Sequence, residues 1–307
     1  MSASRIISGG NGHHPVVALV PAHNEERFIG SVVLKARQHV DRVIVIDDGS
    51  TDDTQEIAQA AGATVVRHEQ NQGKGKALST GLRLARKLDP QAVVVLDGDG
   101  QHLVEEVPRV LAPVLSGEAD IVVGSRYLNG GNGVPRHRVW GHWVFTNLTN
   151  QTSGVCLTDS QSGFRAFSSQ AVEAITFQSN GFSVESEMQF LAHELGLRMT
   201  EVPVTIRYPD KPKRPVLAHG MMVLNGLLQL VGQHRPLLFF SGLGLLLLLA
   251  GLAWGVWVVI IYQQVQSLAI GYTLISTFLA TLGAMNLLAG IVLHAVRGLL
   301  LSLLKPP

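Results

Sequence analysis

The chain has 307 residues, of which 46% are hydrophobic and only 15% are charged, and its mean hydropathy is +0.25. This balance excludes an ordinary soluble protein and indicates a part that lies in lipid. The net charge of +1, without a basic stripe interleaved with aromatics, gives no case for nucleic-acid binding. The single cysteine, Cys156, excludes an internal disulfide and fits a reducing compartment.

The first 14 residues are polar and glycine-rich, and they lack the apolar run of a secretory signal. We therefore expect an N-terminal tail, followed by a catalytic part over 15–210 that stays in the cytoplasm.

From Pro15 to about Val123, short β-branched runs alternate with amphipathic segments of helical pattern. The predicted strands are Val16–Val20, Val43–Asp47, Thr64–Arg67, Val93–Asp97 and Ile121–Gly124. This alternation predicts an α/β fold with a mostly parallel sheet and helices on both faces, in which ligands collect at the carboxyl ends of the strands.

The strongest motif is Asp97-Gly98-Asp99, which follows an apolar strand. Two carboxylates spaced by one small residue suit a hard divalent cation that also binds phosphate oxygens, and Gln101 offers a third oxygen. The alternative is an acidic glycine turn that caps the next helix.

Polar residues also follow the first two predicted strands. Asp47 and Asp48 offer carboxylates to a ribose or a base, and Asn24 and Glu25 offer an amide and a carboxylate to a nucleoside. The structural alternative for Asn24 and Glu25 is a helix start, and the alternative for Asp52 and Asp53 is a cap of the helix predicted at 54–61.

The segment Gly73-Lys-Gly-Lys-Ala77 resembles a phosphate-binding turn before a helix, but it lacks the spacing of a P-loop. Lys74 or Lys76 could reach a diphosphate, and a solvated lysine is the alternative.

The segment after Asn129–Asn132 turns basic and aromatic and is interpreted as a long functional loop. Its notable residues are Arg136, His137, Arg138, Trp140, His142 and Trp143. Beyond it, Glu185–Leu195 has a helical pattern and Thr200–Tyr208 an extended one.

The remaining third predicts attachment to a membrane. Residues 211–235 contain a proline-rich basic linker and an amphipathic interface helix at Val216–Val231. Residues 236–307 contain two apolar stretches long enough to cross a bilayer, Leu237–Ile261 and Ile270–Val296. Arg235, Arg297 and Lys305 flank this hairpin, so both of its ends are expected in the cytoplasm of a cell-membrane protein.

Five motifs together resemble family 2 glycosyltransferases, and more narrowly the dolichol-phosphate mannose synthase group with its bacterial and archaeal polyprenyl-phosphate relatives. They are Pro21-Ala-His-Asn-Glu25, Asp47-Asp-Gly-Ser-Thr-Asp52, Asp97-Gly-Asp-Gly-Gln-His102, Gly124-Ser-Arg-Tyr127 and Ser162-Gly-Phe-Arg165. The resemblance implies a GT-A-like, Rossmann-like fold and inverting transfer of a sugar from a nucleotide-sugar to a polyprenyl or dolichyl phosphate.

The resemblance also implies roles for individual residues. Asp97, Asp99 and Gln101 would hold Mg²⁺ or Mn²⁺ against the donor diphosphate. The donor nucleotide-sugar would lie against Pro21, Asn24, Glu25, Asp48, Asp97, Gly98 and Asp99.

A phosphate acceptor is already dianionic near neutral pH, because its second pKa is about 6, so it needs arginine forks more than a general base. Arg126 and Arg138 match the family's pattern, and with Asp99 they are the expected catalytic residues. Arg136, Arg165 and Arg207 are further candidates for the acceptor phosphate.

Some positions and readings stay open. His142 stands where family members carry a small hydroxyl residue, and a packed histidine is the alternative. Two alternative functions remain. One is a family 2 transferase that acts on a lipid or polysaccharide hydroxyl, and the other is a non-catalytic nucleotide-sugar binder. The sequence does not choose among GDP-mannose, UDP-glucose and UDP-N-acetylglucosamine, or between a monomer and a homo-oligomer.

Overall fold

The computed structural model describes residues 14–128, 136–177, 184–207, 225–226, 228–229, 231–232, 234–267 and 269–304, without the side chains of 136–138 and 300–304. The chain divides into two compact units, Met1–Leu227 and Leu228–Pro307, each considered by itself. Residues 1–13 of the predicted tail, the Asn129–Asn132 segment, the linker at 209–215 and most of the predicted interface helix lie outside the described residues.

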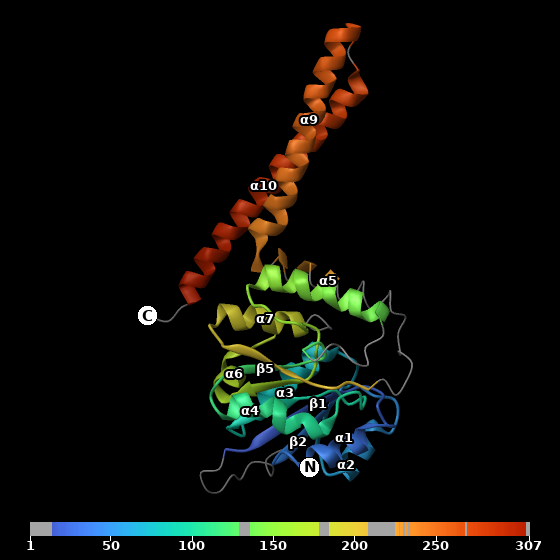
Figure 1. The fold of residues 1–307 in the computed structure, drawn as a ribbon, viewed down its shortest axis with the longest axis vertical. Helices are drawn as coiled ribbons and strands as arrows, with labels where there is room; N and C mark the ends of the chain where they lie inside the picture. Colours follow the sequence, from blue (N-terminus) through green and yellow to red (C-terminus); the bar gives the residue numbers. More distant parts are fainter. Residues whose placement is uncertain are drawn as a thin grey trace. The chain divides into compact units, whose positions relative to one another are not determined.

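The first unit is built on a seven-stranded sheet in the order β3-β2-β1-β4-β6-β5-β7 (Figure 1). The strands are β1 Val16–Ala22, β2 Arg42–Asp47, β3 Thr64–Arg67, β4 Ala92–Val95, β5 Ile121–Ser125, β6 Arg165–Ser168 and β7 Met199–Pro203. The five strands predicted up to Gly124 are confirmed with small shifts at their ends, and the extended segment predicted at Thr200–Tyr208 overlaps β7, which begins one residue earlier.

The sheet is parallel except at β6, which pairs antiparallel with both β4 and β5. β1 pairs in parallel with β2 on one side and β4 on the other, so the chain order reverses between β1 and β4. Such a switch point opens a crevice at the carboxyl ends of the two strands. The predicted nucleoside and Asp97-Gly-Asp99 motifs follow these two strands.

Helices cover both faces of the sheet, as predicted (Figure 1). One face carries α1 Ile29–Ala36, α2 Thr54–Ala60 and α4 Val107–Leu115, and the other carries α3 Lys74–Arg86, α6 Ser169–Ala174 and α7 Val184–Glu194. A single 3-10 turn, η2 Val104–Glu106, leads into α4.

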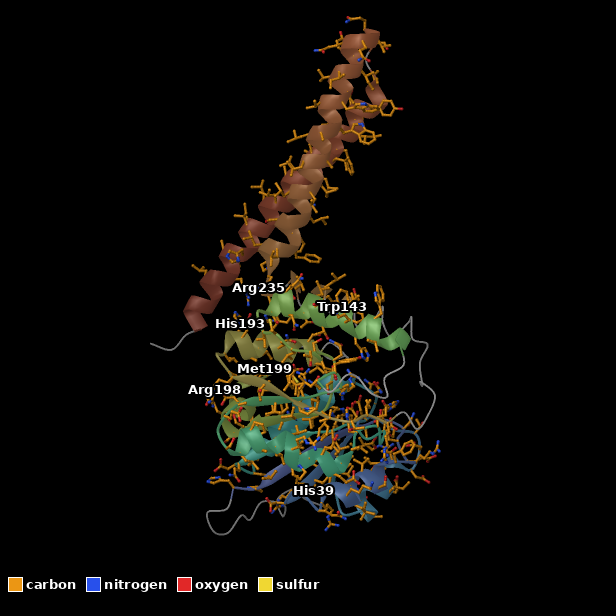
Figure 2. The ribbon with its side chains drawn as sticks, viewed as in Figure 1. His39, Trp143, His193, Arg198, Met199 and Arg235 are labelled. Carbon is orange, nitrogen blue, oxygen red and sulfur yellow. The ribbon has the colours of Figure 1, made fainter. Side chains whose placement is uncertain are left out.

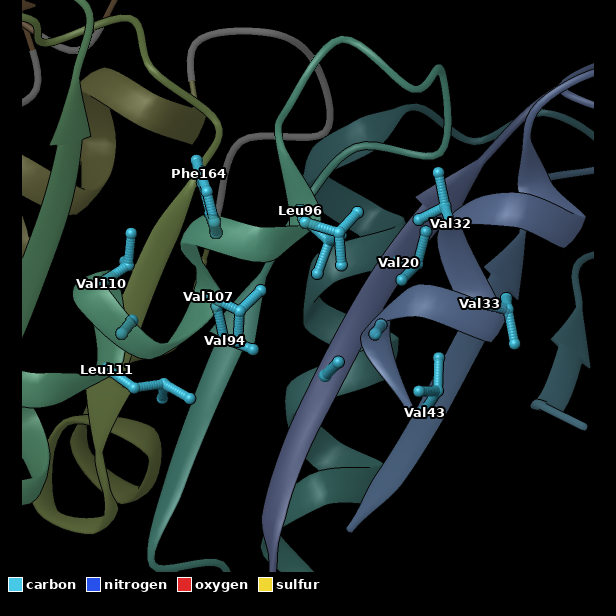
Figure 3. Close-up of a cluster of buried hydrophobic side chains, with 14 of the residues drawn as sticks. Val20, Val32, Val33, Val43, Val94, Leu96, Val107, Val110, Leu111 and Phe164 are labelled. Atoms are coloured by element: carbon cyan, nitrogen blue, oxygen red, sulfur yellow. The ribbon is translucent and has the colours of Figure 1, made fainter. Parts of the chain in front are cut away.

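Strand residues alternate between two buried clusters, as the period of two requires. Val20, Val94 and Leu96 lie in the cluster shown in Figure 3, together with Val107 of α4. Leu19 and its alternate neighbours lie in the other cluster, against α3, α6 and α7. Each fully buried valine or leucine contributes about 1.5–3 kcal/mol, so the sheet that carries the site is a rigid platform.

Two sequence interpretations are corrected. The segment from Arg136 through Trp143 is not a loop, because it begins α5, Arg136–Ser153. Glycine and proline precede this segment, but Arg136–Ser153 itself contains no proline and one glycine, Gly141, so its backbone hydrogen bonds can close into helical turns. Strand β6 is absent from the prediction, because four residues beginning with an arginine carry no alternating apolar signal.

The second unit contains a π-helical turn, η3 Leu237–Ser241, and two long helices, α9 Gly242–Val265 and α10 Ile270–Leu304. The segments Leu237–Val265 and Ile270–Leu299 are long and apolar enough to cross a membrane, by length and composition. They contain both predicted spans.

The two long helices approach closely at small residues. A Cβ added at Gly251 would lie 2.5 Å from the backbone nitrogen of Ala280, and Ser276 Oγ donates to the Gly251 carbonyl at 2.8 Å. Close backbone approach at small residues is the usual packing of helices in lipid. The two helices therefore form an antiparallel hairpin, as predicted.

Candidate active site

The loop after β1 is tied to the loop after β2. Asn24 adopts a φ of 56°, a left-handed conformation that asparagine tolerates. Its backbone N–H donates to Ser50 Oγ at 3.0 Å, and its side-chain oxygen accepts from the Thr51 N–H at 2.8 Å. The Glu25 N–H donates to Thr54 Oγ1 at 2.8 Å. The first two predicted donor loops are therefore held together as one edge.

Asp48 is buried directly after β2, where it organises the start of α3. Its carboxylate accepts the backbone N–H groups of Gln72 at 2.9 Å and Gly73 at 2.8 Å, and it lies 2.7 Å from His68 Nδ1. The structure thus gives Asp48 a role in positioning the 72–73 turn. Its predicted contact with a nucleoside stays a prediction.

The Asp97-Gly-Asp99 motif lies against the end of β1. A Cβ added at Gly98 would lie 3.2 Å from Ala22 Cβ and 3.5 Å from the Pro21 carbonyl oxygen, so a glycine permits this close approach. The Gln101 N–H donates to Asp99 Oδ1 at 3.0 Å and closes the turn. The structure therefore brings Pro21 and the two carboxylates of the motif to one place, as the sequence predicts.

Lys74, for which the sequence left open a diphosphate contact or a solvated position, pairs with the first carboxylate of this motif. Lys74 Nζ lies 2.6 Å from Asp97 Oδ1 and 2.8 Å from Glu185 Oε1, and His102 Nε2 lies 3.5 Å from Asp97 Oδ2. Lys74 is the first residue of α3, and the turn held by Asp48 directs it inward. Lys76, two positions on, is exposed, so only the first lysine of the motif reaches the site.

The charges of this cluster shift the titration of its members. Burial alone would raise the pKa of Asp97, but the Lys74 ammonium and His102 outweigh burial and hold that pKa well below its usual range. Burial would lower the pKa of Lys74, and the two carboxylates instead raise it. Burial and the negative charge of Asp97 raise the pKa of Asp99. Asp99 is therefore the carboxylate of the motif that forms no ion pair with the described residues.

This arrangement fits Mg²⁺ or Mn²⁺. Within the described part of the chain, no group of three or more His, Cys, Asp or Glu side chains could hold a metal. Asp97 and Asp99 offer two carboxylates, and Mg²⁺ is commonly held by one or two carboxylates together with water and substrate phosphate oxygens. Burial and the neighbouring Asp97 carboxylate both raise the pKa of Asp99, and a dication bound to the two carboxylates would offset both effects.

Arg126, which is predicted to bind the acceptor phosphate, follows β5 and is held by a buried carboxylate. Its Nε and one terminal nitrogen each lie 2.6 Å from an oxygen of Asp159. Burial would raise the pKa of Asp159, but the Arg126 charge lowers it. This two-point contact fixes the guanidinium, which lies 5.8 Å from the Tyr127 ring centroid.

Tyr127 joins this arginine to α5, because its hydroxyl lies 2.6 Å from His142 Nδ1. His142 is thus half-buried with a polar partner, and its role toward an acceptor stays open. Arg136 and Arg138 lie in the first turn of the same helix, and their side chains are outside the described residues. Trp140 and Trp143 of α5 are 71% and 61% exposed, and Trp143 is labelled in Figure 2.

The other two arginine candidates differ in position. Arg165 is fully buried, and its guanidinium donates to the carbonyls of Ser160 at 2.7 Å and Ser162 at 2.9 Å. Burial lowers the pKa of Arg165 to about 10. These donors hold the 160–162 backbone, and the predicted contact of Arg165 with the acceptor phosphate stays a prediction. The Arg207 side chain is exposed, and its N–H donates to the Gln101 carbonyl at 2.9 Å, beside the acidic motif.

A mostly parallel sheet with an Asp-Gly-Asp motif at its switch point defines a GT-A-like glycosyltransferase. The chain belongs to glycosyl transferase family 2, whose profile matches residues 17–176.

Relatives and solved structures agree with this assignment. The chain is 32% identical to UDP-N-acetylglucosamine–dolichyl-phosphate N-acetylglucosaminyltransferase of Methanococcus voltae, over 69% of this chain and 91% of the relative. It is 31% identical to undecaprenyl-phosphate mannosyltransferase of Micrococcus luteus, over 62% of this chain and 82% of the relative. The fold is similar to glucosyl-3-phosphoglycerate synthase of Mycobacterium tuberculosis in complex with Mn²⁺, UDP and glucosyl-3-phosphoglycerate, with a TM-score of 0.58 and 27% identity over 71% of this chain and 80% of that chain.

Proposed function

We propose that this protein transfers a sugar, with inversion, from a nucleotide-sugar to the phosphate of a polyprenyl or dolichyl phosphate at the cytoplasmic face of the cell membrane. The observation that carries the proposal is the acidic motif at the switch point, with Arg126 fixed by Asp159 after β5. The two relatives whose names include dolichyl and undecaprenyl phosphates support the acceptor class.

The donor lies along the edge formed by the loops after β1, β2 and β4. Asn24, Glu25 and Asp48 lie on the nucleoside side, and Asp97 and Asp99 with Gln101 hold Mg²⁺ or Mn²⁺ near the diphosphate. The solved structure with Mn²⁺ and UDP supports this choice of ion. When bound, such an ion stabilises the negative charge that develops on the departing nucleoside diphosphate. Lys74 adds a fixed positive charge beside Asp97.

The acceptor phosphate is bound by Arg126 and Arg138, with Arg136 and Arg207 as further donors. Their positive charge offsets the repulsion between two anionic substrates. One phosphate oxygen attacks the anomeric carbon as the bond from that carbon to the diphosphate breaks, which inverts the configuration. The acceptor is already dianionic, so no protein base has to remove a proton. The apolar hairpin holds the enzyme where the lipid substrate lies.

The proposal is tested by acceptor choice. Full-length protein in phospholipid vesicles is incubated with Mn²⁺ and radiolabelled UDP-N-acetylglucosamine, UDP-glucose or GDP-mannose, together with either a polyprenyl phosphate or the free polyprenol. We expect label in the lipid phase only with the phosphate. Equal transfer to the free polyprenol would favour a hydroxyl acceptor, and no transfer from any donor would favour a non-catalytic binder; either result overturns the proposal.

A further inference from the structure

Glu185 is a buried carboxylate of the site that no motif predicts. It lies in the first turn of α7, is 5% exposed, and its Oε1 accepts from Lys74 Nζ at 2.8 Å. The same ammonium contacts Asp97 Oδ1 at 2.6 Å. The Lys74 ammonium therefore bridges Glu185 and the motif that we assign to the donor diphosphate.

The second oxygen of this carboxylate is unsatisfied. Glu185 Oε2 is buried and has no hydrogen-bond partner within the described part of the chain. The nearby Arg165 guanidinium donates hydrogen bonds to the carbonyls of Ser160 and Ser162 instead. A buried polar atom without a partner is costly, so native proteins seldom keep one without a reason. An unsatisfied acceptor beside a ligand site is ready for a donor that the ligand brings.

A glycine lies directly against the Lys74–Asp97 ion pair beside this carboxylate. A Cβ added at Gly163 would lie 2.7 Å from both Lys74 Nζ and Asp97 Oδ2. No side chain therefore separates the 162–163 turn from the ion pair.

We propose that Glu185 Oε2 accepts a hydrogen bond from a hydroxyl of the sugar being transferred, which makes Glu185 a residue that determines donor specificity. This inference rests on the proposed function. The transferred sugar is joined directly to the diphosphate, so it is the part of the donor nearest to Asp97 after the phosphates. A carboxylate only accepts hydrogen bonds, and a sugar hydroxyl is a donor that can reach it. Lys74 stays paired with Oε1 and orients the carboxylate.

The test compares binding of whole donors and donors that lack one hydroxyl. Full-length protein in detergent with Mn²⁺ is titrated with whichever of UDP-N-acetylglucosamine, UDP-glucose and GDP-mannose it binds best. It is then titrated with the 3-, 4- and 6-deoxy analogues, with the 2-deoxy analogue for glucose or mannose, and with the nucleoside diphosphate alone. We expect one analogue to bind the wild type at least about tenfold more weakly than the parent donor, because the missing hydroxyl leaves the buried Glu185 Oε2 without a hydrogen-bond donor.

The variants decide whether Glu185 causes that discrimination. In Glu185→Ala, the ratio of the affinity for the parent donor to that for the discriminated deoxy analogue should fall to less than about threefold. The affinity for the nucleoside diphosphate should change by less than about threefold. Asp120→Asn is the matched control, because Asp120 pairs with Arg198 at 3.0 Å directly before β5, at the opposite edge of the sheet. It should keep the wild-type ratio.

Three outcomes are informative. If Glu185→Ala weakens the parent donor and the deoxy donor equally, Glu185 only positions Lys74, and the inference is overturned. If the wild type binds all deoxy donors as well as the parent, it is overturned without any variant. If no nucleotide-sugar binds, the proposed function itself fails, which is distinct from both.

Discussion

Lys74 Nζ lies 2.6 Å from Asp97 Oδ1, so the first residue of α3 neutralises the first carboxylate of the Asp-Gly-Asp motif. Asp48, after β2, fixes the turn before α3 and so positions Lys74, while Asp97 follows β4. The ion pair therefore connects the ends of β2 and β4. Lys74 therefore belongs to the architecture of the site as well as to its charge.

Replacing this lysine should destabilise the fold. Lys74→Met leaves Asp97 and Glu185 without their shared cation, and breaking a buried ion pair costs about 3–5 kcal/mol. Thermal unfolding of the full-length protein in detergent measures the loss. Lys76→Met, at an exposed lysine on the same helix, should change stability by less than about 0.5 kcal/mol. Equal melting of the two variants would show that the Lys74 pair contributes nothing.

The Arg126 pair with Asp159 should make stability fall in acid. The pKa of Asp159 is lowered in the folded protein, so its contribution is complete above the ordinary value of 3.8 and is lost as the pH falls through the lower folded value. Asp159→Asn should cost about 3–5 kcal/mol near pH 7, because it removes the buried negative charge that pairs with the Arg126 guanidinium.

The same variant should also show a shallower loss of stability below about pH 4, because an amide does not titrate. Melting temperatures of both proteins between about pH 7 and pH 3 give the comparison. Parallel curves would contradict the assignment of this acid sensitivity to Asp159.

A methyl group at Gly163 should disturb donor binding. In Gly163→Ala the added Cβ would lie 2.7 Å from Lys74 Nζ and from Asp97 Oδ2, so the ion pair must move. Overpacking costs about 1–3 kcal/mol, and we expect the affinity for UDP or GDP with Mn²⁺ to fall at least about fivefold by calorimetry. Gly141→Ala adds a methyl group with nothing within 4 Å and should bind as the wild type does. Unchanged affinity in Gly163→Ala would mean that the 162–163 turn adjusts without a loss of binding free energy, which would contradict this prediction.

The hairpin depends on close backbone contact between α9 and α10. Gly251→Ala places a Cβ 2.5 Å from the Ala280 nitrogen, where backbone rather than a flexible side chain must give way. We expect a loss of about 1–3 kcal/mol, measured by detergent-induced unfolding followed through tryptophan fluorescence. Gly271→Ala, with nothing within 4 Å, should unfold as the wild type does. If both variants unfold alike, the contact at Gly251 does not limit stability.

Much of the fold could be predicted from the sequence. The short β-branched apolar runs at Val16, Val43 and Val93 identify buried parallel strands, and two uncharged stretches identify the apolar helices. Strand β6 could not be predicted, because its pairing depends on β4 and β5, which are distant in the sequence. The helix α5 was interpreted as a loop because its residues are basic and aromatic and have no clear apolar face.

The site was predictable where a motif follows a strand. Pro21, Asp97 and Asp99 meet as expected, since parallel strands end at one edge. Glu185 was not predicted, because its only signal was a place in a helical pattern, and its role depends on tertiary contact with Lys74. Arg165 was assigned to the phosphate because sequence cannot tell a buried arginine from an exposed one.

The most direct test of the account is the structure of the product. Wild-type protein in vesicles is given Mn²⁺, a polyprenyl phosphate and the nucleotide-sugar it accepts, and the lipid product is examined by ³¹P and ¹H NMR. We predict a phosphodiester to the anomeric carbon, with the configuration opposite to that in the donor. A sugar joined through any other oxygen, or one with the donor's configuration, would contradict the account.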